Sequence, residues 1–301
     1  MIPTSIALIF SDEKAKANFF HSPSKNTFLE IAPTSVYYAK TKEEFLKVLQ
    51  NCTNDFYCRT IIAIGKVFYS LKFDILKENS SLFFDRPITQ GLQPISTSYF
   101  RLNYTTHLLI LEDDSINLAL KILKQYYYLI DGQALLNHSK NIGNILKEKN
   151  WTISTAESCT GGLICKTLTD VPGASSYVLG GACTYTSKAK NAVLHVPTDI
   201  INKFGIVSQE TAKAMAKGTQ NIYTADIGVS TTGVAGPGPD EKNNPEGLVY
   251  IGIYVNNTFF SYKYSASMHA YLLDRDVIRK SCVLFIFKEL EKILAPEPHE
   301  Q

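Results

Sequence analysis

The hydrophobic and polar positions of the first half of the chain alternate between strand-like and helix-like segments. Short apolar or β-branched runs predict strands, and the apolar spacing over 42–49 predicts a short helix. The runs that predict strands are 6–10, 60–64 and 107–111. This alternation indicates an α/β domain, which we expect over residues 1–134. The stretch 77–106 is polar and rich in turn residues, so it predicts a long excursion.

The second half, 135–301, repeats the alternation and is expected to be a second domain. Apolar periodicity predicts helices at 135–150, 163–168, 188–194, 209–223 and 274–294. Strand-like runs lie at 151–155, 178–186, 226–232, 248–255 and 259–264. Ser208 is a typical N-cap for the helix that follows it. Asn256 and Asn257 predict the turn of a hairpin between the last two strands.

One stretch of the second half, Thr155–Gly162 (TAESCTGG), carries a pattern of chemical interest. It joins a strand to a helix through a glycine turn, which gathers backbone N–H groups around Ser158. A hydroxyl beside such donors suits acyl transfer, because the donors stabilise an oxyanion. An ordinary strand–helix turn with a capping hydroxyl residue explains the same pattern, so the stretch alone does not decide between the two interpretations.

Two further features of the second half point to the same region. The loop Gly233–Pro239 follows a predicted strand, and loops at the carboxyl ends of strands line the ligand crevice of an open α/β sheet. Arg275 and Arg279 are spaced i,i+4 at a helix start, which suits a phosphate clamp or an exposed face paired with neighbouring acids. Glycine turns with an arginine pair favour a phosphorylated small molecule as ligand.

Other kinds of site compete with this one in the sequence. The spacing around Lys166 does not fit a P-loop, and Gly161 stands where an SxxK hydrolase has its lysine. A Cys159 nucleophile with His195 as base remains an alternative, as does a buried structural cysteine. The acids of 112–114 suit a metal or ribose site, or the cap of the next helix.

Composition and charge narrow the function classes. The chain is 45% hydrophobic and its formal net charge is +2, so we expect a globular protein and no nucleic acid partner. No apolar run is long enough to span a bilayer, so no membrane partner is expected. The histidines form no metal-ligand spacing, and the six cysteines no CxxC pair, which favours a cytoplasmic protein without a protein-built metal site.

A family resemblance joins these observations. Six segments of the second half occur in the order found in the C-terminal domain of the CinA family, which includes nicotinamide-mononucleotide deamidases. The segments are TAESCTGG, LTDVPGASS, GACTYTSKAK, GIVSQETAKAMAKG, TGVAGP and PEGLVY. The resemblance implies a three-layer α/β/α sandwich, amide hydrolysis without a cofactor, and self-association into a homo-oligomer. One stretch departs from the family: the 238–244 loop lacks its usual double glycine and has Asn244 where the family has lysine.

The resemblance also implies the site. Ser158 is the nucleophile, Tyr185 assists and Lys190 is the base, with Lys188 as a competitor for that role. The residues expected to bind a small-molecule mononucleotide are Thr160, Gly161, Gly162, Thr232, Gly233, Ala235, Gly236, Arg275 and Arg279. The predicted reaction converts nicotinamide mononucleotide to nicotinic acid mononucleotide and ammonia. The altered loop leaves an alternative, a non-catalytic nucleotide-binding or scaffolding protein that has kept the pocket.

Overall fold

The computed structural model describes residues 5–11, 15–17, 34–54, 58–64, 97–101, 107–111, 132–268 and 275–295. The chain divides into two compact units, Met1–Tyr127 and Tyr128–Gln301. The first unit ends seven residues before the boundary expected from the sequence. Each unit has its own sheet.

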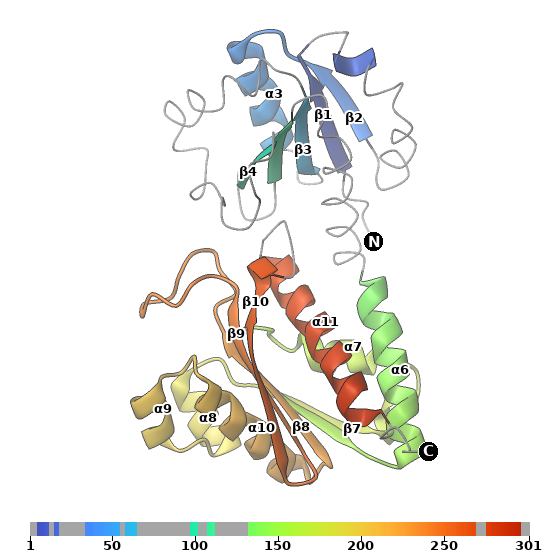
Figure 1. Ribbon diagram of the computed structural model, residues 1–301, viewed down its shortest axis with the longest axis vertical. Helices are drawn as coiled ribbons and strands as arrows, with labels where there is room; N and C mark the ends of the chain where they lie inside the picture. The colour runs from blue at the N-terminus through green and yellow to red at the C-terminus, as the bar shows by residue number, and fades with distance from the viewer. Residues whose placement is uncertain are drawn as a thin grey trace, which may run out of the picture. The chain divides into compact units, whose positions relative to one another are not determined.

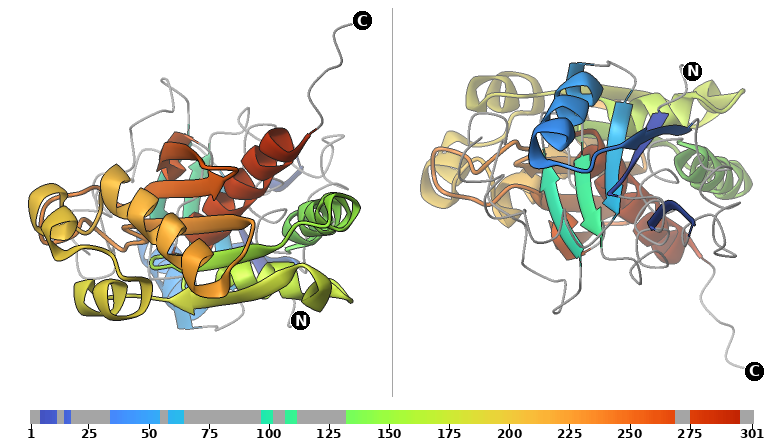
Figure 2. Two further views of the ribbon diagram at one scale, coloured as in Figure 1. Left: turned by 90° about the horizontal axis from the view of Figure 1, so that it is seen from below. Right: turned by 90° about the horizontal axis from the view of Figure 1, so that it is seen from above.

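The N-terminal unit holds a five-stranded sheet in the order β2-β1-β3-β5-β4. Its elements are β1 (Ser5–Phe10), β2 (Thr34–Tyr38), α3 (Lys42–Asn54), β3 (Cys58–Ile64), β4 (Thr97–Arg101) and β5 (His107–Leu111). Strands β2, β1, β3 and β5 are parallel, and β4 pairs with β5 in the antiparallel sense. Figure 2 (right) looks onto this unit, with α3 in blue lying over the strands.

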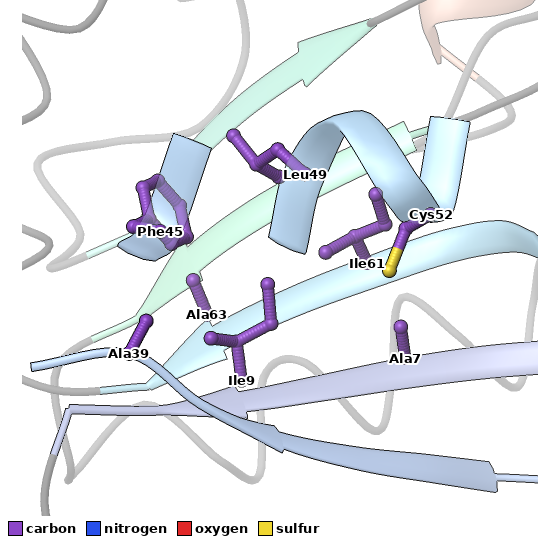
Figure 3. Close-up of a cluster of buried hydrophobic side chains, with 8 residues drawn as sticks. All are labelled: Ala7, Ile9, Ala39, Phe45, Leu49, Cys52, Ile61 and Ala63. Atoms are coloured by element: carbon purple, nitrogen blue, oxygen red, sulfur yellow. The ribbon is translucent and has the colours of Figure 1, made fainter. Parts of the chain in front are cut away.

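Alternate residues of β1 and β3 face α3 and form the core of the N-terminal unit. Phe45, Leu49 and Cys52 lie on one face of α3, because their spacing follows the helical period. They pack on small and branched side chains of the strands, as Figure 3 shows. The strand residues on the opposite face, such as Leu8 and Ile62, are also fully buried. Burial on both faces explains why these strands read as continuous apolar runs rather than as alternating ones.

The C-terminal unit holds a second five-stranded sheet in the order β10-β9-β8-β6-β7 (Figure 1). Its strands are β6 (Ile153–Glu157), β7 (Val178–Cys183), β8 (Ile227–Gly233), β9 (Leu248–Val255) and β10 (Thr258–Ser265). Its helices are α6 (Gln133–Lys149), α7 (Leu163–Thr169), α8 (Ser187–Leu194), α9 (Thr198–Phe204), α10 (Gln209–Tyr223) and α11 (Arg275–Leu294), with short 3-10 turns η2 (Ala174–Ser176) and η3 (Ala266–Met268).

The two faces of this second sheet are covered by different helices. On β10, Tyr262 and Tyr264 face α11, where both rings contact Phe285. Ser261, which directly precedes Tyr262 in the strand, faces the other way and accepts a hydrogen bond from Gln209 at the start of α10. Helices α6 and α7 join α11 on its side, and α8 and α9 join α10. The C-terminal unit is therefore a three-layer α/β/α sandwich, as predicted.

Helix α10 approaches the sheet closely because glycines face it. A Cβ atom on Gly228 of β8 would stand 2.1 Å from the Ala216 carbonyl oxygen, and one on Gly252 of β9 would stand 2.6 Å from the Ala212 oxygen. Ser230 of β8 pairs with Gly252 and donates a hydrogen bond to the Ala212 carbonyl at 2.6 Å. This tight contact fixes β8, whose carboxyl end leads into the glycine-rich loop.

Most predicted elements appear within a few residues of their expected bounds. Helix α10 and its Ser208 cap are confirmed, since the Ser208 hydroxyl accepts a hydrogen bond from the Thr211 N–H. Two strands and a helix were missed: β2, β4, which lies inside the predicted excursion 77–106, and α9. The acidic residues 112–114 lie outside the described residues. None of the described helices combines the length and hydropathy that crossing a bilayer requires.

Candidate active site

Three loops of the C-terminal unit meet at one edge of its sheet. Strands β7 and β8 both run parallel to β6, so their carboxyl ends lie together. The loops that begin there carry Ser158 after β6, Tyr185 after β7 and Gly236 after β8. This edge is where open α/β sheets bind ligands.

The turn after β6 is built by the buried carboxylate of Glu157. Its two oxygens accept hydrogen bonds from the Ile164 N–H at 3.0 Å and the Cys165 N–H at 2.9 Å, at the start of α7. Gly161 and Gly162 have φ angles of 65° and 93°, which glycine adopts without strain. The chain therefore reverses sharply, and Ser158 comes to lie at the edge of the sheet.

Ser158 and Lys190 are in direct contact. The Lys190 Nζ lies 2.9 Å from the Ser158 Oγ and 2.6 Å from the Thr184 carbonyl oxygen. Lys190 is fully buried, and Ser158 is 7% exposed. A neutral amine in this position donates to the Thr184 carbonyl and uses its lone pair to accept the Ser158 proton.

Burial changes the chemistry of this lysine. Desolvation lowers the pKa of Lys190 to about 8, and the neighbouring Cys159 and Cys183 oppose the shift only in part. An amine with such a pKa is neutral in a useful fraction of molecules near physiological pH, and can work as a general base. Lys188 is exposed on α8 and lacks the buried surroundings of Lys190.

The geometry argues against Cys159 as the nucleophile. Cys159 is buried, and desolvation raises the pKa of its thiol to about 12, despite the positive charges of Lys190 and Arg279. The reactive thiolate is therefore nearly absent at neutral pH. His195 is exposed at the end of α8, and no hydrogen bond joins it to Cys159 within the described part of the chain.

A cavity of about 570 Å³ opens beside Ser158. This volume lies in the range of small-molecule sites. The cavity is lined by Ser158, Cys159, Tyr185, Ile206, Val207, the segment 232–242 and Arg275. Its wall therefore includes Thr232, Gly233, Ala235 and Gly236 from the predicted set.

Arg275 connects two walls of this cavity. One terminal nitrogen of its guanidinium donates to the Gly236 carbonyl, and the other donates to the Tyr185 hydroxyl. Tyr185 is 53% exposed. Its hydroxyl therefore lies against the arginine at the cavity wall, and its only described hydrogen bond is to that arginine.

The other predicted binding residues lie outside the cavity lining. The Arg279 Nε donates to the Cys159 carbonyl at 2.8 Å, and its guanidinium packs against Gly161, 3.5 Å from where a Cβ would stand. Arg279 thus supports the turn that carries Ser158, and it does so from outside the cavity lining. Thr160 is buried and its hydroxyl meets the Thr231 hydroxyl at 2.7 Å, while Gly162 begins α7.

Several contributors were not singled out in the sequence. Thr184 provides the carbonyl that holds Lys190, and Thr231 supports the turn through the Ser158 N–H at 3.5 Å. Both are buried threonines at strand ends, and this position is the only signal that the sequence offers. In the described ranges, no three His, Cys, Asp or Glu side chains come together in a group able to hold a metal ion.

Comparisons with known proteins point to one family. Residues 136–294 match the family model of the CinA C-terminal domain. A CinA-like protein of Petrotoga mobilis is 30% identical over 94% of this chain and 76% of its own length. A putative competence-damage inducible protein of Clostridium tetani is 48% identical over 41% of this chain, which spans only 30% of that protein.

Solved structures resemble the C-terminal unit. The competence/damage inducible protein CihA of Agrobacterium tumefaciens is 33% identical, with a TM-score of 0.50 over 53% of this chain and 95% of its own. A CinA superfamily protein of Escherichia coli, 24% identical with a TM-score of 0.50, shares the fold. With the family model covering more than half of the sequence, the chain belongs to the CinA family through its C-terminal domain.

Proposed function

We propose that the C-terminal unit hydrolyses the carboxamide of nicotinamide mononucleotide. The observation that carries the proposal is the 2.9 Å contact between the Ser158 Oγ and the Nζ of the fully buried Lys190. The contact lies at the wall of a cavity large enough for a mononucleotide. A hydroxyl paired with a neutral amine supports acyl transfer, because the amine removes the hydroxyl proton as the oxygen attacks.

In the first half of the reaction, neutral Lys190 accepts the Ser158 proton while Oγ bonds to the carboxamide carbon. The carbonyl oxygen becomes an oxyanion. The turn after β6 has backbone donors for it: in the described structure the N–H groups of Thr160 and Gly162 make no hydrogen bond, whereas the Gly161 N–H donates to the Ser158 carbonyl at 3.0 Å. Protonated Lys190 then gives its proton to the leaving nitrogen, and ammonia departs.

In the second half, a water molecule attacks the acyl-enzyme, with Lys190 again as the base. The acyl–oxygen bond breaks, and the proton returns to the Ser158 oxygen. The sum is nicotinamide mononucleotide plus water giving nicotinic acid mononucleotide plus ammonia. Tyr185 and Arg275 line the cavity together, and we assign them to contact with the substrate rather than to proton transfer from Ser158.

Release of ammonia from nicotinamide mononucleotide by the full chain tests the proposal. The variant Ser158→Ala is expected to lose turnover entirely, whereas Cys159→Ala is expected to keep it, because the Cys159 thiol is protonated. The opposite pattern would reassign the nucleophile. A thermal shift with the mononucleotide but without ammonia release would instead favour a binding protein.

A further inference from the structure

The loop between β8 and β9 carries most of the charged side chains that are found in the cavity lining. Lys242, Asp240 and Glu241 line the cavity from this loop, and Arg275 lines it from α11. Among the lining residues that the structure describes, two are cations, and they differ in their hydrogen bonding.

Arg275 already makes two hydrogen bonds within the protein. Its terminal nitrogens hold the Gly236 carbonyl and the Tyr185 hydroxyl, which fixes the plane of the guanidinium. Lys242 differs, because its ammonium makes no hydrogen bond or ion pair with any of the described residues. The Lys242 Nζ lies 3.7 Å from where a Cβ of Gly205 would stand, next to Ile206 of the cavity lining.

The loop holds Lys242 in place without a ligand. One oxygen of Asp240 accepts the backbone N–H groups of Lys242 at 3.0 Å and Asn244 at 2.8 Å, and its other oxygen accepts the Asn244 side-chain amide. Partial burial acts to raise the pKa of Asp240, but these hydrogen bonds outweigh it and keep the pKa below its usual range. Glu246 fixes the first part of the loop by accepting the Gly238 N–H at 3.1 Å.

We propose that Lys242 binds the phosphoryl group of the substrate and so sets the preference for a mononucleotide over the corresponding nucleoside. This inference rests on the proposed function, since it takes the carboxamide to lie at Ser158. A phosphoryl group needs a cation with free donors, and the Lys242 ammonium offers three. Asp240 and Glu241 add negative charge to the same lining, so a cation is needed there before an anion can bind.

The test compares two ligands that differ only by the phosphoryl group, nicotinamide mononucleotide and nicotinamide riboside. Their Kd values are measured by calorimetry on the full chain carrying Ser158→Ala, which prevents turnover during the titration. Lys242→Gln in this background is expected to weaken mononucleotide binding about tenfold and to leave riboside binding unchanged. Lys263→Gln, which removes an exposed lysine of β10, is the matched control and should change neither value.

The outcomes separate the two proposals. Equal weakening of both ligands would assign Lys242 to loop shape, and no change would also overturn the inference, as would failure of the chain to bind either ligand. If the unsubstituted chain releases no ammonia but mononucleotide binding still depends on Lys242, the proposed reaction fails and the phosphoryl site stands.

Discussion

At the scale of single residues, the site depends on where one lysine lies. Lys190 stands among the largest fully buried side chains of the described structure. A charged ammonium in that position is costly, so burial favours the neutral form. The Thr184 carbonyl and the Ser158 hydroxyl satisfy the amine without adding a carboxylate that would hold it protonated. The result is an amine suited to accept a proton.

This lysine predicts the pH dependence of the reaction. Lys190 must be neutral to act as a base, and burial lowers its pKa to about 8. Below that value the neutral fraction rises about tenfold per pH unit, and above it the fraction levels off. We therefore expect kcat/KM for ammonia release to climb from pH 6 to a plateau above pH 8.

The same experiment has internal controls. Lys190→Met is expected to abolish turnover at every pH, whereas Lys188→Met, two residues earlier on the exposed side of α8, should keep both the rate and the profile. A rate that is flat across this pH range, or that survives in Lys190→Met, would show that another group is the base.

At the scale of secondary structure, the site depends on three parallel strands that end together. Strand β6 supplies Ser158, β7 supplies Thr184 and Tyr185, and β8 leads into Gly236. Helix α8 then brings Lys190 into contact with Ser158. This helix begins at its N-cap Thr186, whose hydroxyl accepts a hydrogen bond from the Ala189 N–H at 3.1 Å. Lys190 on α8 therefore contacts Ser158 in the loop after β6 and the Thr184 carbonyl in the loop after β7.

Helix α10 supports this arrangement, and its cap can be tested. The buried Ser208 hydroxyl accepts from the Thr211 N–H at 3.1 Å and donates to the Gly205 carbonyl at 2.9 Å. Ser208→Ala removes the cap, so we expect it to destabilise the C-terminal unit by about 1 kcal/mol, seen as a lower urea midpoint. Ser175→Ala, at an exposed serine of η2, should leave the midpoint unchanged. Equal midpoints for the two variants would contradict the capping role.

At the scale of the whole molecule, the chain separates into two units with their own sheets and cores. Every lining residue of the cavity that the structure describes belongs to the unit Tyr128–Gln301. We therefore expect a protein consisting of residues 128–301 to fold and to release ammonia from nicotinamide mononucleotide with the kcat/KM of the full chain. Circular dichroism checks the fold and an ammonia assay checks the rate. A folded fragment with much lower activity would mean that the N-terminal unit contributes to the reaction.

The sequence alone determined the class of fold and most elements, because these follow from local periodicity and capping. Local residues are enough to predict α10 from its apolar period and its Ser208 cap, and to predict the turn at Asn256 and Asn257. Local signals fail where an element depends on distant partners. Strand β4 is one such case, since it is defined by its antiparallel pairing with β5.

Only the tertiary structure decided what the candidate site residues touch. The sequence does not state that Lys190 is buried and Lys188 exposed, or that Arg279 holds the Cys159 carbonyl while Arg275 holds Tyr185. It also gives no sign that Lys242 lines the cavity. These properties arise because residues far apart in the chain share one edge of a sheet, where burial and neighbouring charges, rather than residue type, set the chemistry.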